Sequence, residues 1–157
     1  MPSIADALDR IERAFADAPR PPDEELLHAD CRDDNDIAAL YGIPDWRVVP
    51  ADIVEREYAA LFFLSPAGFR QFLPAYMSWV LRHPKSGAAV VESTLQALTP
   101  ASGELHAFSL SKFTLLDDAQ RIAIRLFLET MSDATRGAAI VGDALAYWRA
   151  SPGDAPA

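Results

Sequence analysis

The chain has 157 residues, of which 50% are hydrophobic and 24% are charged, and its formal net charge is −9 at pH 7. This composition is typical of one soluble globular domain, and a chain of this length can bury about 70% of its unfolded surface in a single core. It contains neither an apolar span of about 20 residues nor the basic start of a signal peptide, so we expect a cytoplasmic protein with no membrane partner.

The negative charge is concentrated at the start of the chain. Residues 1–36 contain eleven acidic side chains and four arginines, a net charge of −7. A surface of this sign repels nucleic-acid phosphates and speeds the encounter with a basic protein. We therefore expect no nucleic-acid partner. A basic protein partner is one hypothesis, and a solvated face that only keeps the protein soluble is the alternative.

The first predicted elements are two helices separated by prolines. Ser3 and Asp6 have the spacing of a capping box. The apolar stripe that follows has helical spacing and consists of Ile4, Leu8, Ile11 and Phe15. Prolines in residues 19–22 end this helix, and the acidic residues 23–25 are typical of the first turn of a second, short helix.

Residues 30–36, with the sequence DCRDDND, form the densest acidic cluster. The candidate binding residues for a basic partner are Asp30, Asp33, Asp34 and Asp36. Arg32 and Ala38 interrupt the alternation of oxygen ligands that an EF-hand loop requires, so we predict no calcium loop. His28 and Cys31 could face one metal ion, but the spacing supplies no further ligands, and we predict no metal site. A single cysteine excludes an internal disulfide and is typical of a reducing compartment.

The next segment is predicted to contain a short helix, a proline-bounded connection and a longer helix. Asp34 or Asn35 is expected to cap a helix over residues 37–41, with Gly42 at its C-terminal end. Trp46 lies in the connection, and we expect it to fill the edge of the core with its indole N–H hydrogen-bonded to a residue nearby in the sequence. Residues 52–63 then have the apolar pattern of a helix.

The apolar segment 61–81, LFFLSPAGFRQFLPAYMSWVL, is the predicted centre of the fold. Ser65 followed by Pro66 predicts a helix that begins at the proline, because the serine oxygen can accept from a free backbone N–H. One helical face then carries Phe69, Phe72, Leu73, Tyr76, Met77, Val80 and Leu81. Pro74 lies within this face and removes a backbone hydrogen bond, at a cost of about 3 kcal/mol in a helix interior. We expect a kink there, or two abutting helices.

Arg70 is the one charged group between residues 65 and 81. Its paired donors suit a planar carboxylate or phosphate, and Phe69, Tyr76 and Trp79 could form an aromatic pocket around it. The candidate binding residues on this hypothesis are Arg70, Tyr76 and Trp79. The alternative is a structural ion pair, or an exposed guanidinium above a buried stem.

Residues 84–113 contain the least regular pattern of the chain. Ser86 is expected to cap a helix whose apolar positions run from Val90 to Leu98. Residues 104–113 fit neither the helical nor the strand period. We therefore expect an extended strip or an irregular lid there, with a small hairpin as the alternative.

The C-terminal part is predicted to form two helices. Asp117 and Gln120 have capping-box spacing and open a buried helix that runs through Met131. Asp133 is expected to open the last helix, and residues 151–157 to form a disordered tail. Eleven of the twelve prolines lie at termini, helix starts or connections, which favours an all-α single domain over residues 1–150. An α+β domain with a small hairpin near 104–113 is the alternative.

The run LSPAGFRQFLPAYM, together with Phe113 and the segment LDDAQRIAIRLFL, resembles a family of small bacterial proteins of unknown function. The similarity covers residues 46–128 and rests on a proline–helix–proline spacing with a Phe–Arg pair inside it. The resemblance implies a shared fold and a bacterial source, and it implies no activity. Relatives of this kind often carry a second cysteine near the position of Cys31. This chain has only one, so the resemblance does not support a shared cysteine chemistry.

The sequence contains no nucleophile elbow, phosphate-binding loop, dinucleotide fingerprint or zinc-protease signature. A conceivable acid/base set is His83, His106 or Glu92, with Arg70 as an anion holder. We favour a non-catalytic, acidic protein-binding module without a cofactor, for example an immunity-type inhibitor that sequesters a basic protein. The alternative is a small-molecule-binding protein, or an enzyme of unknown reaction, with the aromatic pocket around Arg70.

Overall fold

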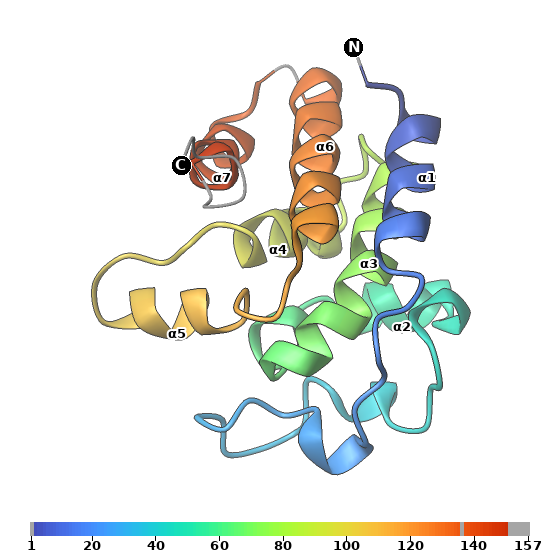
Figure 1. Cartoon of the computed structure of the whole chain (residues 1–157), viewed down its shortest axis with the longest axis vertical. Helices are drawn as coiled ribbons and strands as arrows, with labels where there is room; N and C mark the ends of the chain where they lie inside the picture. Colours follow the sequence, from blue (N-terminus) through green and yellow to red (C-terminus); the bar gives the residue numbers. More distant parts are fainter. Residues whose placement is uncertain (1, 136, 151–157) are drawn as a thin grey trace.

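The computed structural model describes residues 2–135 and 137–150, and these residues form an all-α domain (Figure 1). The α-helices are α1 (Ile4–Ala14), α2 (Ala51–Arg56), α3 (Pro66–Arg82), α4 (Ala89–Ala97), α5 (His106–Ser111), α6 (Asp118–Ala134) and α7 (Ala139–Arg149). Within the described ranges, the sole β contact is an isolated antiparallel bridge between Leu27 and Leu64. The predicted all-α fold is therefore confirmed. The hairpin near 104–113 is wrong, because that segment forms a 3-10 turn (Gly103–Leu105) and α5.

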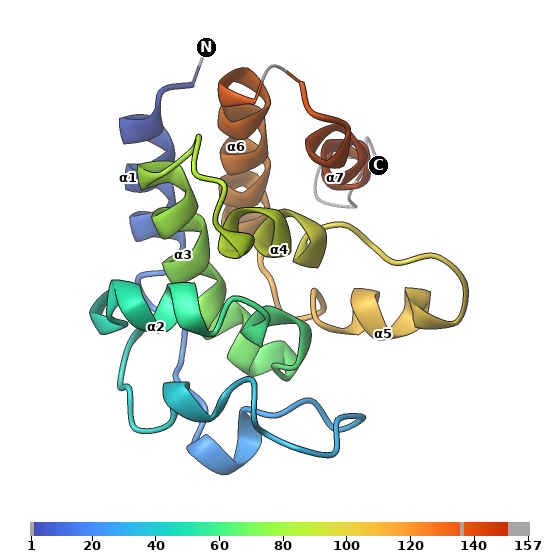
Figure 2. The ribbon, with the colours of Figure 1, turned by 180° about the vertical axis from the view of Figure 1, so that it is seen from behind.

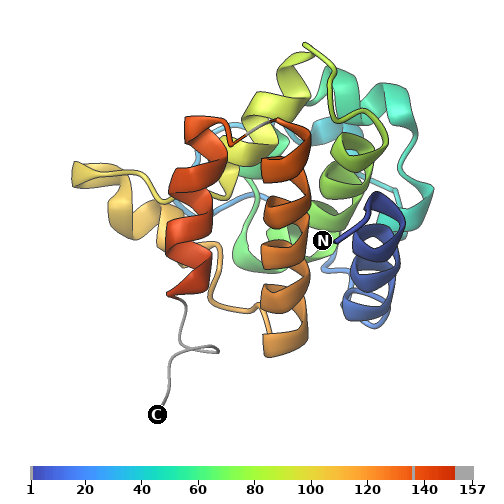
Figure 3. The same ribbon diagram turned by 90° about the horizontal axis from the view of Figure 1, so that it is seen from above.

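The helices are arranged around α3. Figure 3 shows α7, α6 and α1 side by side as one layer, and α6 packs against both of its neighbours. Behind this layer, α3 packs on α1 and α4, and α2 crosses the lower part of α3 (Figure 2). The short helix α5 projects to one side of the other helices, at the end of a long loop.

The central helix begins where the sequence predicts. Ser65 Oγ accepts the N–H of Gly68 at 3.1 Å, and Pro66 takes the first helical position, where its missing N–H costs nothing. Every residue from Gln71 to Leu81 is buried. The helix runs without a break through Pro74, so the alternative of two abutting helices is wrong.

The buried polar groups of α3 hold the irregular N-terminal segments against it. Gln71 Oε1 accepts the backbone N–H of Trp46 at 2.9 Å, and Gln71 Nε2 donates to Ala18 O at 2.8 Å. Tyr76 Oη donates to Glu57 O at 2.7 Å. A buried polar group without a partner costs about 1–3 kcal/mol, so these bonds fix the register of the segments that cover α3. The indole of Trp46 is hydrogen-bonded, but it donates to Phe15 O at 3.3 Å, 31 residues away in the sequence, so the predicted local bond is wrong.

Both predicted capping boxes are confirmed. The Ser3 hydroxyl accepts the Asp6 N–H at 3.0 Å, and the Asp6 carboxylate accepts the Ser3 N–H at 3.3 Å. At the start of α6, Asp117 and Gln120 make the same reciprocal pair. Each box satisfies two backbone donors that a helix start leaves free, using only local sequence.

Three other helix boundaries differ from the prediction. The helix expected over 52–63 stops at Arg56, after which the chain turns into a 3-10 helix, Ala60–Phe62. The hydroxyl of Ser86 accepts the N–H of Ala88, but α4 itself starts without a side-chain cap. Asp133 belongs to α6, because α7 begins only at Ala139.

The predicted helix over residues 37–41 is a 3-10 helix, Ala38–Leu40, and it has no side-chain cap. Instead of the Asp34 carboxylate, the backbone carbonyl of Asp34 accepts the N–H groups of Ile37 and Ala38. Gly42 follows with φ +76°, a left-handed conformation that favours glycine, as predicted for the end of this element. The predicted tail, residues 151–157, lies outside the described residues.

We predict opposite effects for two glycine-to-alanine substitutions in helices. At Gly68 an added Cβ would lie 3.1 Å from Leu26 O and 3.2 Å from the Leu64 side chain, so Gly68→Ala should lower the free energy of unfolding by about 1–2 kcal/mol. Gly142, on α7, has no atom within 4 Å of that position, so Gly142→Ala should raise it by about 0.5–1 kcal/mol. Urea denaturation measures both. A Gly68→Ala variant at least as stable as the wild type would contradict the close packing of α3 on Leu26.

Candidate functional site

A cavity of about 570 Å³ lies between α4, α5 and the 3-10 helix Ala60–Phe62. We call it the Lys112 cavity. Its apolar wall consists mainly of Phe62, Phe63, Ala97, Pro100, Leu105, Phe108 and Ile140. Its polar groups include Cys31, Ser109 and Lys112. The cavity is therefore an apolar chamber that contains one ammonium group.

Lys112 is the unusual member of this wall. It immediately follows α5 and is only 2% exposed. Its Nζ lies 5.0 Å from the centre of the Phe108 ring and 5.4 Å from the centre of the Phe62 ring, so two aromatic faces stabilise the cation. Within residues 2–135 and 137–150, the ammonium has no hydrogen bond or ion pair. Burial without a counter-ion lowers the pKa of Lys112 to about 8.

Cys31 and part of the acidic cluster lie near Lys112. Burial raises the pKa of the Cys31 thiol, the positive charge of Lys112 opposes this rise, and the carboxylates of Asp30 and Asp33 add to it. The thiol is therefore neutral near pH 7 and is not an activated nucleophile. Two of the predicted acidic residues thus lie within electrostatic reach of the cavity.

The other two acidic residues are placed differently. The carboxylate of Asp34 accepts the hydroxyl hydrogen bond of Tyr41 at 2.8 Å. Asp36 is half-buried and makes no hydrogen bond or ion pair with any residue that the structure describes. The cluster is therefore not one converging set of ligands.

The buried His28 and the half-buried Ser111 form a pair next to the cavity. His28 Nε2 lies 2.9 Å from Ser111 Oγ, and its ring is 4.4 Å from the ring of Phe108. Asp30 Oδ2 lies 3.9 Å from the other ring nitrogen, so the three side chains follow the order of a hydrolase triad. However, His28 Nδ1 accepts the backbone N–H of Asp30 at 3.1 Å. The proton of the neutral ring is then on Nε2, which donates to the serine and cannot accept its proton.

The electrostatics of His28 support the same conclusion. Burial lowers the pKa of His28, the Asp30 carboxylate opposes this shift, and Lys112 adds to it. The imidazole is therefore neutral near pH 7. The Ser111 hydroxyl in turn donates to Phe108 O at 2.6 Å. The pair holds α5 to the segment around His28, so its role is structural and not catalytic.

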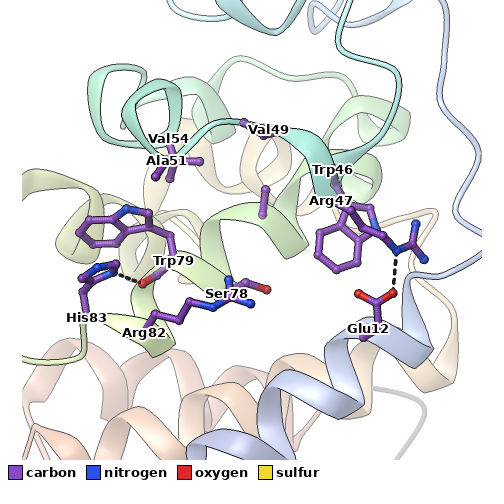
Figure 4. A pocket seen from close by; sticks show the side chains of 11 residues that line it. Glu12, Trp46, Arg47, Val49, Ala51, Val54, Ser78, Trp79, Arg82 and His83 are labelled. Atoms are coloured by element: carbon purple, nitrogen blue, oxygen red, sulfur yellow. Dashed lines mark hydrogen bonds and ion pairs between the residues drawn. The ribbon is translucent and has the colours of Figure 1, made fainter.

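The structure does not bring Arg70, Tyr76 and Trp79 to one cavity. Arg70 Nη1 donates to Leu115 O at 3.2 Å, and the side chain lines a separate cavity of about 320 Å³. Tyr76 is fully buried in the core, and burial raises the pKa of its hydroxyl. Trp79 lines a third cavity, of about 260 Å³ (Figure 4). The aromatic pocket expected around Arg70 is therefore not formed.

The conceivable acid/base residues are not assembled either. Glu92 accepts a hydrogen bond from the next turn of α4. His83 Nδ1 donates to Trp79 O at 2.9 Å, and His106 Nδ1 donates to Ala101 O at 2.9 Å. Each group is therefore bonded to its own local backbone or helix neighbour, and none is paired with another.

Among residues 2–135 and 137–150, no three histidine, cysteine, aspartate or glutamate side chains are placed to hold a metal ion. No helix in the same ranges has the length and apolar character needed to cross a bilayer.

Sequence reasoning missed Lys112. The chain has only two lysines, and Lys112 lies within the apolar run LSKFTLL. A lone lysine between apolar residues is the available signal, because lysine is rarely buried without a partner. Sequence spacing alone could not show that Lys112 lies in an aromatic environment, because Phe62 and Phe108 are brought to it only by the tertiary fold.

Comparison with known proteins identifies the family of this chain but indicates no activity. The model of a family of unknown function (DUF6714) matches residues 4–151. No curated protein and no solved structure matches the chain. The matched range includes the residues that line the three cavities.

We predict that Lys112→Met stabilises the protein. At pH 7 the wild type buries a cation without a counter-ion, so the substitution should raise the free energy of unfolding by about 1–3 kcal/mol. The folded pKa, about 8, lies below the ordinary value of 10.5. Between these values the unfolded chain binds more protons, so wild-type stability should rise with pH there, and the variant should lack this rise.

Urea denaturation at a series of pH values measures this difference, with the exposed Lys85→Met as the matched control. Lys85→Met should keep the wild-type pH profile. A destabilised Lys112→Met variant, or one with the wild-type pH profile, would show that the ammonium is not buried as described.

Proposed function

The chain belongs to DUF6714, a family of unknown function, and we propose that it binds a small amphipathic carboxylate in the Lys112 cavity. One observation carries the proposal: a buried ammonium without a carboxylate partner forms part of the wall of an apolar cavity. The volume, about 570 Å³, lies within the range of about 300–1,000 Å³ typical of small-molecule sites.

The chemistry of the wall defines both ends of the ligand. A carboxylate would supply the counter-ion that Lys112 lacks, and a charge-assisted hydrogen bond is strong in a low-dielectric site. The apolar body would contact rings and aliphatic groups, with Phe62, Leu105 and Ile140 on three different segments of the chain. Removing such a body from water contributes about 25 cal/mol for each Å² that is buried.

A single negative charge fits the cavity better than a double one. Lys112 is the one cation of the wall, whereas Asp30 and Asp33 lie close enough to raise the pKa of the neighbouring Cys31. A phosphate dianion would meet this negative field with only one positive charge to balance it. We therefore propose a monocarboxylate.

Binding is proposed rather than catalysis. A nucleophile needs an adjacent base or a lowered pKa, and neither condition holds near the cavity. The thiol pKa of Cys31 is raised, and the proton arrangement of His28 does not activate Ser111. These features favour a ligand carrier or sensor.

A second proposal is the basic protein partner suggested by the acidic N-terminal part. Several of its carboxylates are paired within the protein, in the ion pairs Asp9–Arg13, Glu12–Arg47 and Asp23–Arg20. Glu24, Glu25 and Asp30 are exposed, and no arginine or lysine in the described part of the chain pairs with them. These groups, with Asp33 and Asp36, remain available to a basic surface, as in an immunity-type inhibitor. We also propose a bacterial source and a cytoplasmic location, for which the family resemblance and the single cysteine are the support.

We predict that octanoate binds the wild type and that octanol binds more weakly. Lys112→Met should reduce octanoate affinity about tenfold or more, because a hydrogen bond to a charged group contributes about 1.5–3 kcal/mol. The affinity should fall as pH rises above about 8, where the free Lys112 loses its proton. Isothermal titration calorimetry measures each value.

Lys85→Met should bind octanoate like the wild type. Since Lys112→Met is expected to be the more stable protein, loss of binding in this variant cannot be a consequence of unfolding. Equal affinities of the wild type and Lys112→Met for octanoate would overturn the proposal.

For the second proposal, the protein immobilised on a surface should retain a stoichiometric basic protein from a lysate of its native host. The association rate of the purified partner should fall steeply with salt, because it depends on long-range attraction. The double substitution Asp30→Asn and Asp33→Asn should slow association, and Asp118→Asn, exposed at the start of α6, should not. A partner that associates at a salt-independent rate would contradict the proposal.

A further inference from the structure

The cavity of about 260 Å³ that Trp79 lines lies between α2, α3 and the 3-10 helix Trp46–Val48. We call it the Trp79 cavity. Figure 4 shows its wall: the indoles of Trp46 and Trp79 lie on two sides, and Ser78 and Arg82 come from α3 between them. No lining residue is shared with the Lys112 cavity, so the two sites are independent.

The Trp79 cavity contains hydrogen-bond donors that the protein does not use. Trp79 is only 6% exposed, and its indole Nε1 is buried without a hydrogen-bond partner. The other two indoles are bonded: that of Trp46 to Phe15 O at 3.3 Å, and that of Trp148 to Leu98 O at 2.7 Å. Trp79 is thus the exception among the three tryptophans.

Ser78 and Arg82 add further free donors. Ser78 is 5% exposed, and its hydroxyl makes no hydrogen bond to a residue in the described ranges. Arg82 is exposed at the end of α3, and within the same ranges its guanidinium has no carboxylate or carbonyl partner. Buried donors usually find partners inside a protein, so the free N–H of Trp79 is unusual. The Ser78 hydroxyl and the exposed guanidinium of Arg82 are two further donors on the same wall, available to an external acceptor.

The charge of the cavity points to a monoanion. Arg47 is already neutralised, because its guanidinium lies 2.6 Å from Glu12 and 2.9 Å from Asp45. His83 Nδ1 donates to Trp79 O, and its ring stacks on the indole of Trp79 at 4.1 Å. Arg82 is therefore the one cation of this wall without an ion pair among the described residues.

The shape and the remaining wall suit a flat apolar body. Besides the two indoles, the lining includes the small aliphatic residues Val49, Ala51, Val54 and Ala75. The volume holds about eight or nine groups of the size of water, each of which occupies about 30 Å³ in the liquid. A six-membered ring with a carboxylate has this size. Aromatic rings also pack favourably against indoles in offset or edge-to-face geometry.

We propose that the Trp79 cavity binds a small aromatic monocarboxylate. Its carboxylate accepts from the guanidinium fork of Arg82 and from the Ser78 hydroxyl, and its ring lies against Trp79 and Val54. A planar carboxylate matches the paired donors of a guanidinium better than the single point charge of an ammonium. A phosphate dianion fits less well, because Glu12 lies at the same wall and only one arginine is free to balance the charge.

Benzoate is the probe, and the indole N–H signals in proton–nitrogen correlation spectra are the measurement. The signals of the tryptophans are assigned with Trp79→Phe and Trp148→Phe variants. Benzoate at millimolar concentration should shift the Trp79 signal, and the Trp148 signal should stay in place, since that indole lies outside the cavity and is bonded to Leu98 O. Benzamide, which has the same shape without the charge, should shift the Trp79 signal far less.

Two substitutions test the role of Arg82. Arg82→Gln should weaken benzoate binding about tenfold or more, and Arg82→Lys should keep the charge but recover only part of the affinity. Lys85→Gln, an exposed cation outside the cavity lining, should bind like the wild type. A Trp79 signal that does not respond to benzoate, equal binding of benzamide, or wild-type affinity in Arg82→Gln would each overturn the proposal.

Discussion

The burial of α3 is the constraint on which the rest of the structure depends. Because every residue from Gln71 to Leu81 is buried, the remainder of the chain has to cover this helix on all sides and bond its polar groups. Gln71 and Tyr76 meet this requirement through three long-range hydrogen bonds, which draw the irregular segments before α3 onto its surface. Prolines and short 3-10 helices suit these segments, since regular helices could not follow so tight a path.

The two proposed sites are exceptions to this internal bonding. Trp79 Nε1 is buried without a hydrogen-bond partner, as are Arg70 Nε and Thr94 Oγ1. Lys112 is 2% exposed and has no hydrogen-bond acceptor among the described residues. An unpartnered buried donor lowers stability by about 1–3 kcal/mol, and a buried cation lowers it more. A domain with a hydrophobic core of this extent can stay folded despite such losses of stability. Lys112 and the indole of Trp79 both line cavities, which is why we assign these residues to binding and not only to the fold.

The elements that the sequence predicted correctly depend on local chemistry. The capping boxes at Ser3 and Asp117 and the Ser65–Pro66 helix start need only neighbouring residues, so they could be recognised without a structure. The predicted pocket around Arg70 does not form, and the helical periodicity of the sequence already gives the geometric reason. Trp79 is nine residues further along the same helix, about two and a half turns, and therefore lies on the opposite face. The Lys112 cavity could not be predicted, because its lining comes from segments that are distant in the sequence.

The position of α5 determines what forms one side of the Lys112 cavity. This short helix packs most closely on the adjacent 3-10 turn Gly103–Leu105, and it projects away from the layers formed by the longer helices. Segments with little support from the core detach at a smaller free-energy cost than the whole domain needs to unfold. The contact between Ser111 and His28 holds this helix to the rest of the domain. An occupant that contacts Leu105 and Phe108 on one side and Phe62 on the other would add to that hold. Affinity for the occupant and the stability of residues 101–112 are thus coupled, so a substitution that weakens the packing of this segment should also weaken binding without changing the ammonium.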